Sequence, residues 1–438
     1  MTSYLIKGAS LLGESSADIA LHGGFFVEPE DLVGVSDIVT IDANGLVALP
    51  GLVDLHTHLR QPGMEQAETV LSGSQAAAMG GFTAVHAMAN TDPVADNAAI
   101  TDTVWNLGKK AGYVDVRPVG AVTKGLAGAQ LSGIDAMAAG ASQVRVFSDD
   151  GKCVHDSALM RQALRAVSAR GGVLAQHAQD PRLTEGSVMN ESALSSRLGL
   201  AGWPAVAEES IIARDVLLAQ SVGARLHVCH LSTAGSLEVI AWAKKRGINV
   251  TAEVTPHHLL LTEDLVAGYD PVFKVNPPLR SKEDTEALRK GVASGLIDII
   301  ATDHAPHPSE AKDCAFPEAA FGMLGLETAL GVALHALVEP GQLRLRDLAR
   351  VMSQKPAEIG GLLGYEKPFE IGKPGHLVLA DLSALTPPPS ASLSNNNPFA
   401  NIALQGQVRD TFFGGLRTVA EGELVAHENL DTNKGLRQ

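Results

Sequence analysis

The sequence predicts an α/β protein: a (β/α)8 TIM barrel with a small β-sandwich domain formed by the N- and C-terminal segments. Three observations lead to this prediction. Short β-rich runs alternate with Ala- and Leu-rich helical stretches from about residue 50 to 305, eight such runs can be counted, and both flanks contain only short strand-like runs and turns. Alternating strands and helices indicate a parallel sheet, and eight units close a barrel.

The eight candidate strands are short apolar runs bounded by turn residues. They lie at residues 51–58, 82–89, 114–122, 141–148, 172–178, 224–230, 249–257 and 297–304. Helical patterns separate them, for example at residues 157–171 and 208–223, and the second of these ends on a glycine, as helices often do. The order of elements therefore follows repeated βα units.

The two flanks of the barrel are predicted to share one β domain. Residues 1–50 form its N-terminal part, residues 51–365 the barrel, and residues 366–438 its C-terminal part. A Pro- and Asn-rich segment at residues 384–399 predicts an irregular loop.

Composition excludes several classes of protein. The chain has 438 residues, of which 45% are hydrophobic and 19% charged, as expected for a globular protein with a large core. A formal net charge of −15 argues against nucleic acid or an anionic membrane as a partner. Three widely spaced cysteines indicate no disulfide framework, and no segment has the length and apolarity of a membrane span. These features predict a cytoplasmic protein.

The first predicted strand ends in a His-x-His pair, His56 and His58, followed by Arg60. Side chains alternate along a strand, so all three point to the same side if the strand persists that far. Two imidazoles on one face can share a metal ion, although an isolated pair is equally compatible with two hydrogen-bonded histidines at a strand end.

Further histidines and aspartates follow other predicted strands, at the end where reactive groups gather in a parallel barrel. Each alone has an ordinary explanation as a turn or a helix cap. Their joint placement predicts a metal site built from imidazole and carboxylate, a donor set that suits Zn²⁺. Four histidines and two aspartates make six ligands, which are too many for one tetrahedral zinc, whereas two metals about 3.5 to 4 Å apart use them all. The histidines and aspartates that follow these other strands are Asp149, Asp150, His177, His230, Asp303, His304 and His307.

Seven motifs occur in a fixed order along nearly the whole chain: "DLHTHLRQPG", "AMANTDP", "FSDDG", "QHAQD", "CHLST", "NPPLR" and "ATDHAPH". In these motifs the sequence resembles the amidohydrolase superfamily and, more closely, the bacterial type I dihydroorotases. The resemblance implies a cyclic amide hydrolase that is zinc-dependent. The implied reaction is the reversible hydrolysis of (S)-dihydroorotate to N-carbamoyl-L-aspartate in de novo pyrimidine (UMP) biosynthesis.

The resemblance also assigns metal ligands. It implies that His56, His58 and Asp303 bind one zinc ion and that His177 and His230 bind a second. Asp150 would bridge the two ions, where many relatives of the superfamily use a carboxylated lysine. The choice of Asp150 over Asp149 rests on the resemblance alone.

The resemblance further implies a set of residues that contact the substrate. Arg60 can make bidentate hydrogen bonds to a substrate carboxylate. Asp303 is implied as the catalytic residue that takes a proton from the attacking water and returns it to the leaving ring nitrogen, with His304 and His307 as alternatives. The implied substrate-binding residues are His58, Arg60, Asn90, Asn276, His307, Phe321 and Gly322.

Two other functions remain open from the sequence. A hydantoinase, dihydropyrimidinase or allantoinase would share the barrel and the metals, but Arg60 and Asn90 favour a substrate that bears a carboxylate. A catalytically silent, dihydroorotase-like scaffold subunit of aspartate transcarbamoylase would be expected to lose metal ligands, and none is lost. A homodimer and a complex with aspartate transcarbamoylase are the candidate assemblies.

Overall fold

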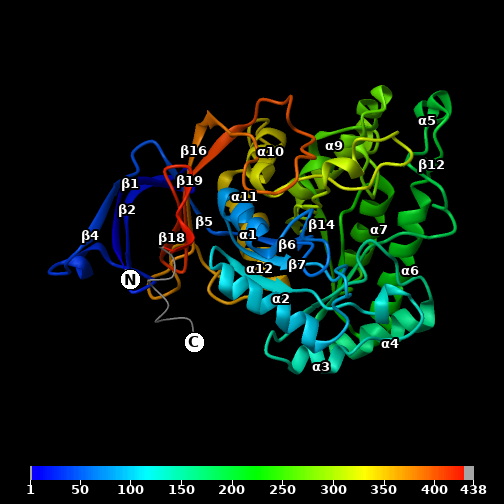
Figure 1. The fold of residues 1–438 in the computed structure, drawn as a ribbon, viewed down its shortest axis with the longest axis horizontal. Coiled ribbons are helices and arrows are strands. Elements are labelled where there is room, and N and C mark those ends of the chain that lie inside the picture. Colours follow the sequence, from blue (N-terminus) through cyan, green and yellow to red (C-terminus); the bar gives the residue numbers. More distant parts are fainter. Residues whose placement is uncertain (1, 429–438) are drawn as a thin grey trace.

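A closed barrel forms the larger part of the molecule, and a β-rich unit lies at one end of it (Figure 1). The computed structural model describes residues 2–428. Two parallel sheets make the barrel, β6-β7-β8 and β9-β10-β13-β14-β15. Their strands are β6 (Leu52–Thr57), β7 (Phe82–Ala87), β8 (Asp115–Pro118), β9 (Val146–Phe147), β10 (Val173–Gln176), β13 (Leu226–Val228), β14 (Val250–Val254) and β15 (Ile299–Ile300).

Two isolated bridges join these sheets into a ring. Gly120 pairs in parallel with Phe147 on β9, and Thr57 at the end of β6 pairs in parallel with His304 beyond β15. The His58 N–H also donates to the His304 carbonyl at 2.8 Å. All eight predicted strands are therefore present and adjacent in chain order, and the predicted fold class is confirmed.

Helices follow the strands around the barrel (Figure 1). The predicted helical patterns are confirmed as α4 and α6, and α6 ends at Gly223, whose left-handed φ of 66° suits glycine. The helices are α1 (Val70–Met79), α2 (Ala98–Ala111), α3 (Ile134–Ala139), α4 (Ser157–Ser168), α5 (Ala193–Leu198), α6 (Val206–Val222), α7 (Ala234–Lys245), α8 (Pro256–Leu260), α9 (Lys282–Ser294), α10 (Ala329–Ala333), α11 (Leu345–Ala349) and α12 (Lys355–Gly360). Among the described residues, no helix has the length and apolarity needed to cross a membrane.

Shorter elements fill the connections. Two π-helical turns lie at Leu334–Val338 and Arg350–Gln354, and a two-stranded ladder joins β11 (Met189–Asn190) to β12 (Gly202–Trp203). The 3-10 turns are Pro29–Leu32, Lys124–Leu126, Glu263–Gly268, Pro271–Phe273, Ser309–Ala311 and Leu326–Thr328.

The β-rich unit is a nine-stranded sheet that combines both ends of the chain. Its order is β19-β18-β17-β16-β5-β1-β2-β3, with β4 beside β1. The two halves meet where β16 runs antiparallel to β5, with Leu377 opposite Pro50. The strands are β1 (Ser3–Leu11), β2 (Ser15–His22), β3 (Phe25–Val27), β4 (Ile38–Asp42), β5 (Val47–Pro50), β16 (Leu377–Leu385), β17 (Gln405–Phe413), β18 (Leu416–Ala420) and β19 (Glu423–Leu424).

The sheet buries side chains on both faces because alternate residues point in opposite directions. Leu377 and Leu379 pack with strands of the N-terminal half in a core of their own. Val378 and Val408 face the other way and belong to the core of the barrel. The sheet is thus packed firmly against the barrel.

A single glycine, Gly51, connects the sheet to the barrel between β5 and β6. Its N–H donates to the His376 carbonyl at 3.0 Å. A Cβ at this position would lie 2.3 Å from Thr83 Oγ1, so no larger residue fits without rearrangement. This close approach fixes where the first barrel strand begins.

Candidate metal and active centre

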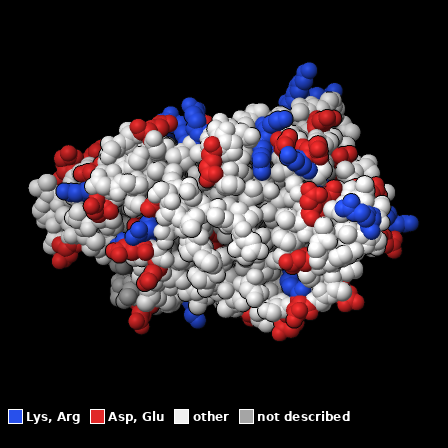
Figure 2. Space-filling model, turned by 90° about the horizontal axis from the view of Figure 1, so that it is seen from above, with Lys and Arg blue, Asp and Glu red and all other residues white. Residues whose placement is uncertain are grey.

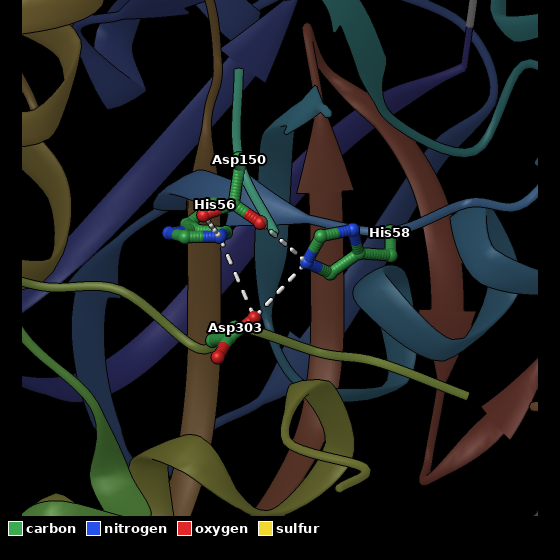
Figure 3. A group of neighbouring side chains, drawn as sticks. All are labelled: His56, His58, Asp150 and Asp303. Carbon is green, nitrogen blue, oxygen red and sulfur yellow. Dashed lines mark hydrogen bonds and ion pairs between the residues drawn. The ribbon is translucent and has the colours of Figure 1, made fainter. Parts of the chain in front are cut away.

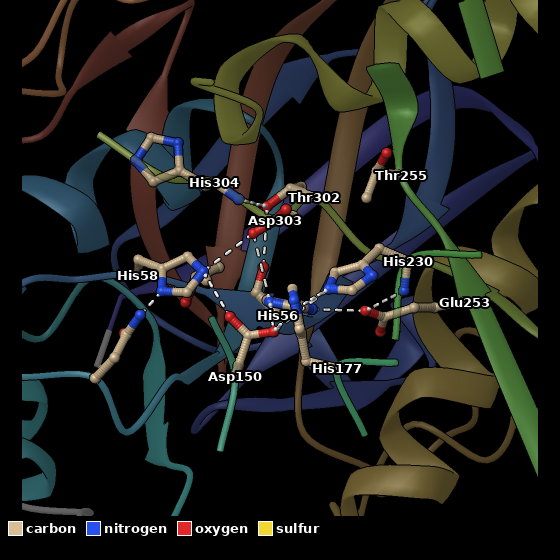
Figure 4. Close-up of polar contacts among 12 residues, drawn as sticks. His56, His58, Asp150, His177, His230, Glu253, Thr255, Thr302, Asp303 and His304 are labelled. Atoms are coloured by element: carbon tan, nitrogen blue, oxygen red, sulfur yellow. Dashed lines mark hydrogen bonds and ion pairs between the residues drawn. The ribbon is translucent and has the colours of Figure 1, made fainter. Parts of the chain in front are cut away.

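Four histidines and two aspartates meet at the carboxyl ends of the barrel strands (Figures 3 and 4). His56 lies on β6, His177 follows β10 directly, and the others lie in the first residues beyond their strands. All six side chains are buried. The structure therefore brings together every residue that the sequence analysis named as a metal ligand: His56, His58, Asp150, His177, His230 and Asp303.

One group of four side chains consists of Asp303 and the three residues around it, His56, His58 and Asp150 (Figure 3). Asp303 Oδ1 lies 3.0 Å from His58 Nε2 and 3.4 Å from His56 Nε2. Asp150 closes the group, because its Oδ1 lies 3.3 Å from His56 Nε2 and its Oδ2 lies 3.3 Å from His58 Nε2. Two imidazole nitrogens and two carboxylates thus face one point.

Asp150 also belongs to a second group, with His177 and His230. Its Oδ1 lies 3.3 Å from His177 Nδ1 and 3.4 Å from His230 Nε2 (Figure 4). One carboxylate therefore faces both groups. The neighbouring Asp149 is used differently: its Oδ1 accepts hydrogen bonds from the N–H groups of Val122 and Thr123 at 2.7 and 2.9 Å.

Two buried atoms of the cluster have no hydrogen-bond partner in the described structure, His56 Nε2 and Asp150 Oδ1. An unsatisfied polar atom in the interior costs about 1–3 kcal/mol. A cation between the histidines and the carboxylates would satisfy both atoms. The donor set of imidazole nitrogen and carboxylate oxygen fits a divalent ion such as Zn²⁺. The residues present therefore fit a metal.

Hydrogen bonds on the far sides of the rings orient them. His56 Nδ1 lies 2.6 Å from Glu253 Oε1, and His58 Nδ1 lies 2.9 Å from Asn90 Oδ1. His177 Nε2 lies 2.8 Å from Gln179 Oε1. Each contact fixes the ring and directs its other nitrogen to the cluster, the usual arrangement around a metal-binding histidine.

Glu253 was missed by the sequence analysis. It lies on β14, is buried, and contacts both His56 and His227, whose Nε2 lies 3.0 Å from Glu253 Oε2. It also accepts the N–H of His230 at 3.2 Å. A charged residue inside a predicted buried strand is rare without a partner, and that was the signal available in the sequence.

The carboxylates and histidines of the cluster stabilise one another's charged forms. Burial alone lowers the pKa of His56, but the carboxylates of Asp150, Glu253 and Asp303 raise it well above its ordinary value. Burial raises the pKa of Asp303, but His56 and His58 outweigh this effect and lower it to about 2. Asp303 is therefore ionised at neutral pH, as a metal ligand or a general base must be.

Three residues of the site have left-handed backbone conformations that are uncommon outside glycine: Arg60, His230 and Asp303, with φ of 61°, 32° and 48°. Such strain gathers at functional sites. The backbone at Arg60 also differs from one expectation of the sequence analysis, that Arg60 points to the same side as His56 and His58. Strand β6 ends at Thr57, so Arg60 does not continue the alternation of His56 and His58.

Arg60 is instead oriented by the loop beyond β15. Its Nε donates to the Pro306 carbonyl at 3.1 Å, and its Nη2 lies 3.4 Å from His307 Nε2. Burial lowers the pKa of Arg60 to about 10, while Asp303 and Asp150 oppose the shift. The guanidinium is therefore a buried cation at neutral pH.

The remaining residues named from the sequence line the same region. His307 Nε2 donates to the Phe321 carbonyl at 2.7 Å, and a Cβ on Gly322 would lie 2.9 Å from that nitrogen. Asn276 Nδ2 donates to Gln179 Oε1 at 3.1 Å. Gln179, Asn276 and Phe321 also line a cavity of about 520 Å³.

His304 is not part of the cluster. Its Nδ1 accepts the N–H of Gly325 at 3.2 Å, and its Nε2 lies 3.5 Å from Glu68. Figure 4 shows its ring directed away from the histidines around Asp150. Its position favours a role in holding the loop, not in proton transfer.

The fold and this arrangement of side chains define a protein of the amidohydrolase type. An L-hydantoinase (dihydropyrimidinase) from Arthrobacter aurescens superposes with a TM-score of 0.84 at 26% identity, covering 97% of this chain and 98% of that one. A dihydropyrimidinase from Brevibacillus agri, at 20% identity and a TM-score of 0.81 over 97% of both chains, shares the fold.

Sequence comparison is more specific. A family model described as "Dihydro-orotase-like" matches residues 45–236. Proteins named dihydroorotase are 58% identical in Leifsonia xyli, over 97% of both chains, and 51% identical in Mycobacterium tuberculosis, over 97% of this chain and 100% of that one. The chain belongs to the dihydroorotase family.

Proposed function

We propose that the protein hydrolyses (S)-dihydroorotate reversibly to N-carbamoyl-L-aspartate, the dihydroorotase step of pyrimidine biosynthesis. One observation carries the proposal: a complete cluster of four histidines and two aspartates lies beside a buried arginine in a chain 58% identical to a protein named dihydroorotase. The cluster suits hydrolysis of an amide, and the arginine suits a substrate that carries a carboxylate.

We further propose two zinc ions per subunit. His56, His58 and Asp303 would hold one ion, His177 and His230 the other, and Asp150 would bridge them. The position of Asp150 supports the bridging role, because its carboxylate lies within 3.4 Å of a nitrogen of each of the four histidines. When bound, such ions lower the pKa of a coordinated water and polarise a carbonyl.

Asp303 is proposed as the catalytic base and acid. Its carboxylate is ionised and faces the cluster, so it can take a proton from the attacking water. The same group can return that proton to the ring nitrogen as the amide bond breaks. Of the two alternatives, His304 faces Glu68 and His307 faces Phe321, which supports Asp303 as the proton carrier.

Substrate recognition is proposed to rest on the wall formed by Arg60, His307 and the loop at Phe321–Gly322. Because the Arg60 Nε donates to the Pro306 carbonyl, the terminal nitrogens of the guanidinium are the ones that would bind a substrate carboxylate. Asn276 has a buried Oδ1 without a hydrogen-bond partner, which supports a contact to a substrate N–H. Asn90 and His58 would complete the site through their mutual contact.

The structure gives less support to the hypothesis that the protein is a hydantoinase, although a hydantoinase shares the fold. Arg60 supplies a buried cation that an uncharged cyclic amide does not need. The scaffold reading also has less support, because the ligand set is intact.

We also propose several properties of the whole molecule. Domain boundaries at residues 50 and 365 agree with the sheet, whose strands stop at Pro50 and resume at Leu377. A cytoplasmic location agrees with three free cysteines. Figure 2 shows basic side chains interspersed with acidic ones on the face in view, which fits a small-molecule substrate better than nucleic acid. A second copy of the chain and aspartate transcarbamoylase are the proposed macromolecular partners.

One experiment tests the proposal directly. Metal content and the rates with dihydroorotate and with hydantoin are measured on a single preparation of purified protein. About two zinc ions per chain and a clear preference for dihydroorotate are expected. A preference for hydantoin would replace the proposed substrate, and full activity after complete removal of metal would overturn the metal site.

A further inference from the structure

The segment between β16 and β17, residues 386–404, does more than connect two strands. It extends from the small sheet over the barrel (orange, Figure 1), and we call it the strap. The Pro- and Asn-rich sequence predicts only an irregular loop here, and the segment is irregular. Its path nevertheless brings residues of the C-terminal part of the chain to the loops that carry the candidate substrate contacts.

Two glutamates of the barrel, the buried Glu68 and the partly buried Glu327, hold the strap in place. The Glu327 carboxylate accepts the N–H groups of Ser390, Ala391 and Ser392 at 2.9, 3.2 and 3.4 Å. Glu68 accepts the Ser392 hydroxyl at 2.5 Å. These contacts fix the segment immediately before its closest approach to the site.

Asn396 is the strap residue that reaches the site. It is 3% exposed, and its side-chain amide forms three hydrogen bonds. Oδ1 accepts the N–H of His307 at 3.2 Å, and Nδ2 donates to the carbonyls of Ala305 and Gly322 at 3.0 and 3.1 Å. Its own carbonyl accepts the N–H of Leu324 at 3.0 Å.

These partners admit only one orientation of the amide. Turning it over would place Nδ2 against the N–H of His307 and Oδ1 against two carbonyl oxygens. The amide therefore joins two separate parts of the loop, the backbone at Ala305–His307 and the backbone at Gly322. A small apolar residue or an acid could not make the same three bonds.

We propose that Asn396 is a positioning residue for substrate binding. By holding the backbone of His307 and Gly322 at a fixed separation, it sets the shape of the wall that these residues form with Arg60. The His307 ring lies between the two parts, since its Nε2 bonds to the Phe321 carbonyl. This inference rests on the proposed function, because it assumes that the wall binds the substrate.

Two variants test the role. Asn396→Ala removes the amide. Asn396→Asp keeps nearly the same shape and the acceptor for His307 but sets an oxygen against two carbonyls. Asn395→Ala is the matched control, because Asn395 is the exposed neighbour on the same strap. KM and kcat for dihydroorotate, zinc content and melting temperature are measured for each full-length protein.

Both Asn396 variants should raise KM by about tenfold or more while kcat and zinc content stay near those of the wild type. A purely structural residue would lower the melting temperature without this split between KM and kcat. A KM equal to that of Asn395→Ala, or a loss of the folded state in both variants, overturns the positioning role. If the wild type does not turn over dihydroorotate, the proposed function fails first, whereas normal kinetics in both variants of an active enzyme defeat this inference alone.

Discussion

Glu253 Oε1 lies 2.6 Å from His56 Nδ1, and both residues are buried, with no more than 1% of their surface exposed. The carboxylate thereby fixes which nitrogen of His56 faces Asp150 and Asp303. Glu253 makes a second contact of the same kind to His227, so its own position is well defined. Glu253, which is not itself a proposed metal ligand, thus determines the orientation of the ligand His56.

Replacing Glu253 with glutamine should weaken metal binding by about 10- to 100-fold, the usual effect of losing such a partner. The amide keeps the volume but lowers the basicity of His56. Zinc affinity measured by competition with a chelator checks this expectation. Glu423→Gln, an exposed change on β19, serves as the control, and equal affinities in the two variants would show that Glu253 has no such role.

Removal of either histidine of the second group, His177→Ala or His230→Ala, should leave a folded protein with little hydrolase activity and less bound metal. The reason is their matched approach to Asp150 Oδ1. Zinc content, circular dichroism and turnover are measured together, with the exposed His155→Ala as control. Near-normal turnover at unchanged zinc content would remove both residues from the ligand set.

Asp303→Asn separates proton transfer from metal binding. The amide oxygen can still face the cluster, but it cannot accept a proton from water. Turnover should fall by about 10²-fold or more while most of the zinc is retained. The exposed Asp313→Asn is the control. If most of the activity survived, another group would have to carry the proton.

Arg60→Met should weaken the handling of dihydroorotate without loss of zinc. A carboxylate left without its charged partner costs about 2 to 4 kcal/mol. Steady-state kinetics with dihydroorotate and with an uncharged cyclic amide distinguish a lost carboxylate contact from general damage, because only the first substrate should suffer. Arg182→Met changes an exposed arginine instead and should leave both substrates unaffected.

Metal affinity should rise with pH through the neutral range. Although burial lowers the pKa of His56, the carboxylates around it raise that pKa well above its ordinary value, so the metal-free protein keeps the proton to higher pH. Zinc requires the neutral imidazole, and each displaced proton changes the affinity by about tenfold per pH unit. Chelator competition at pH 6, 7 and 8 measures the slope. An affinity independent of pH would contradict protonation of His56 in the metal-free state.

The sequence predicted the parts of the fold that follow from local pattern. All eight barrel strands were found because each is a short apolar run between turn residues. The metal ligands were found because histidines and aspartates follow these runs directly. Every predicted strand is longer than the strand in the structure, most of all at 114–122, 141–148 and 297–304. The first of these is Asp115–Pro118. The predicted strand at 141–148 is reduced to Val146–Phe147, since Gln143 adopts a left-handed φ of 47°, and the strand at 297–304 stops at Ile300 before the turn at Asp303.

Contacts made at long range could not be predicted. Asn396 lies 89 residues from His307 in sequence, and nothing in a Pro- and Asn-rich segment indicates which amide will reach the site. Glu68 and Glu327 were missed for the same reason, because their role is to bind backbone groups of that segment. Such contacts depend on the path of the whole chain and not on the periodicity of any one element.

The pairing of β5 with β16 has a consequence for synthesis on the ribosome. The edge of β5 receives its partner only when residues 377–380 have been translated, after the complete barrel has emerged. Until then β5 presents unpaired backbone groups on this side, the kind of edge that promotes association between nascent chains. A product that stops before residue 377 would keep that edge open and would also lack the strap, so premature termination should yield aggregation-prone fragments and not a partly active enzyme.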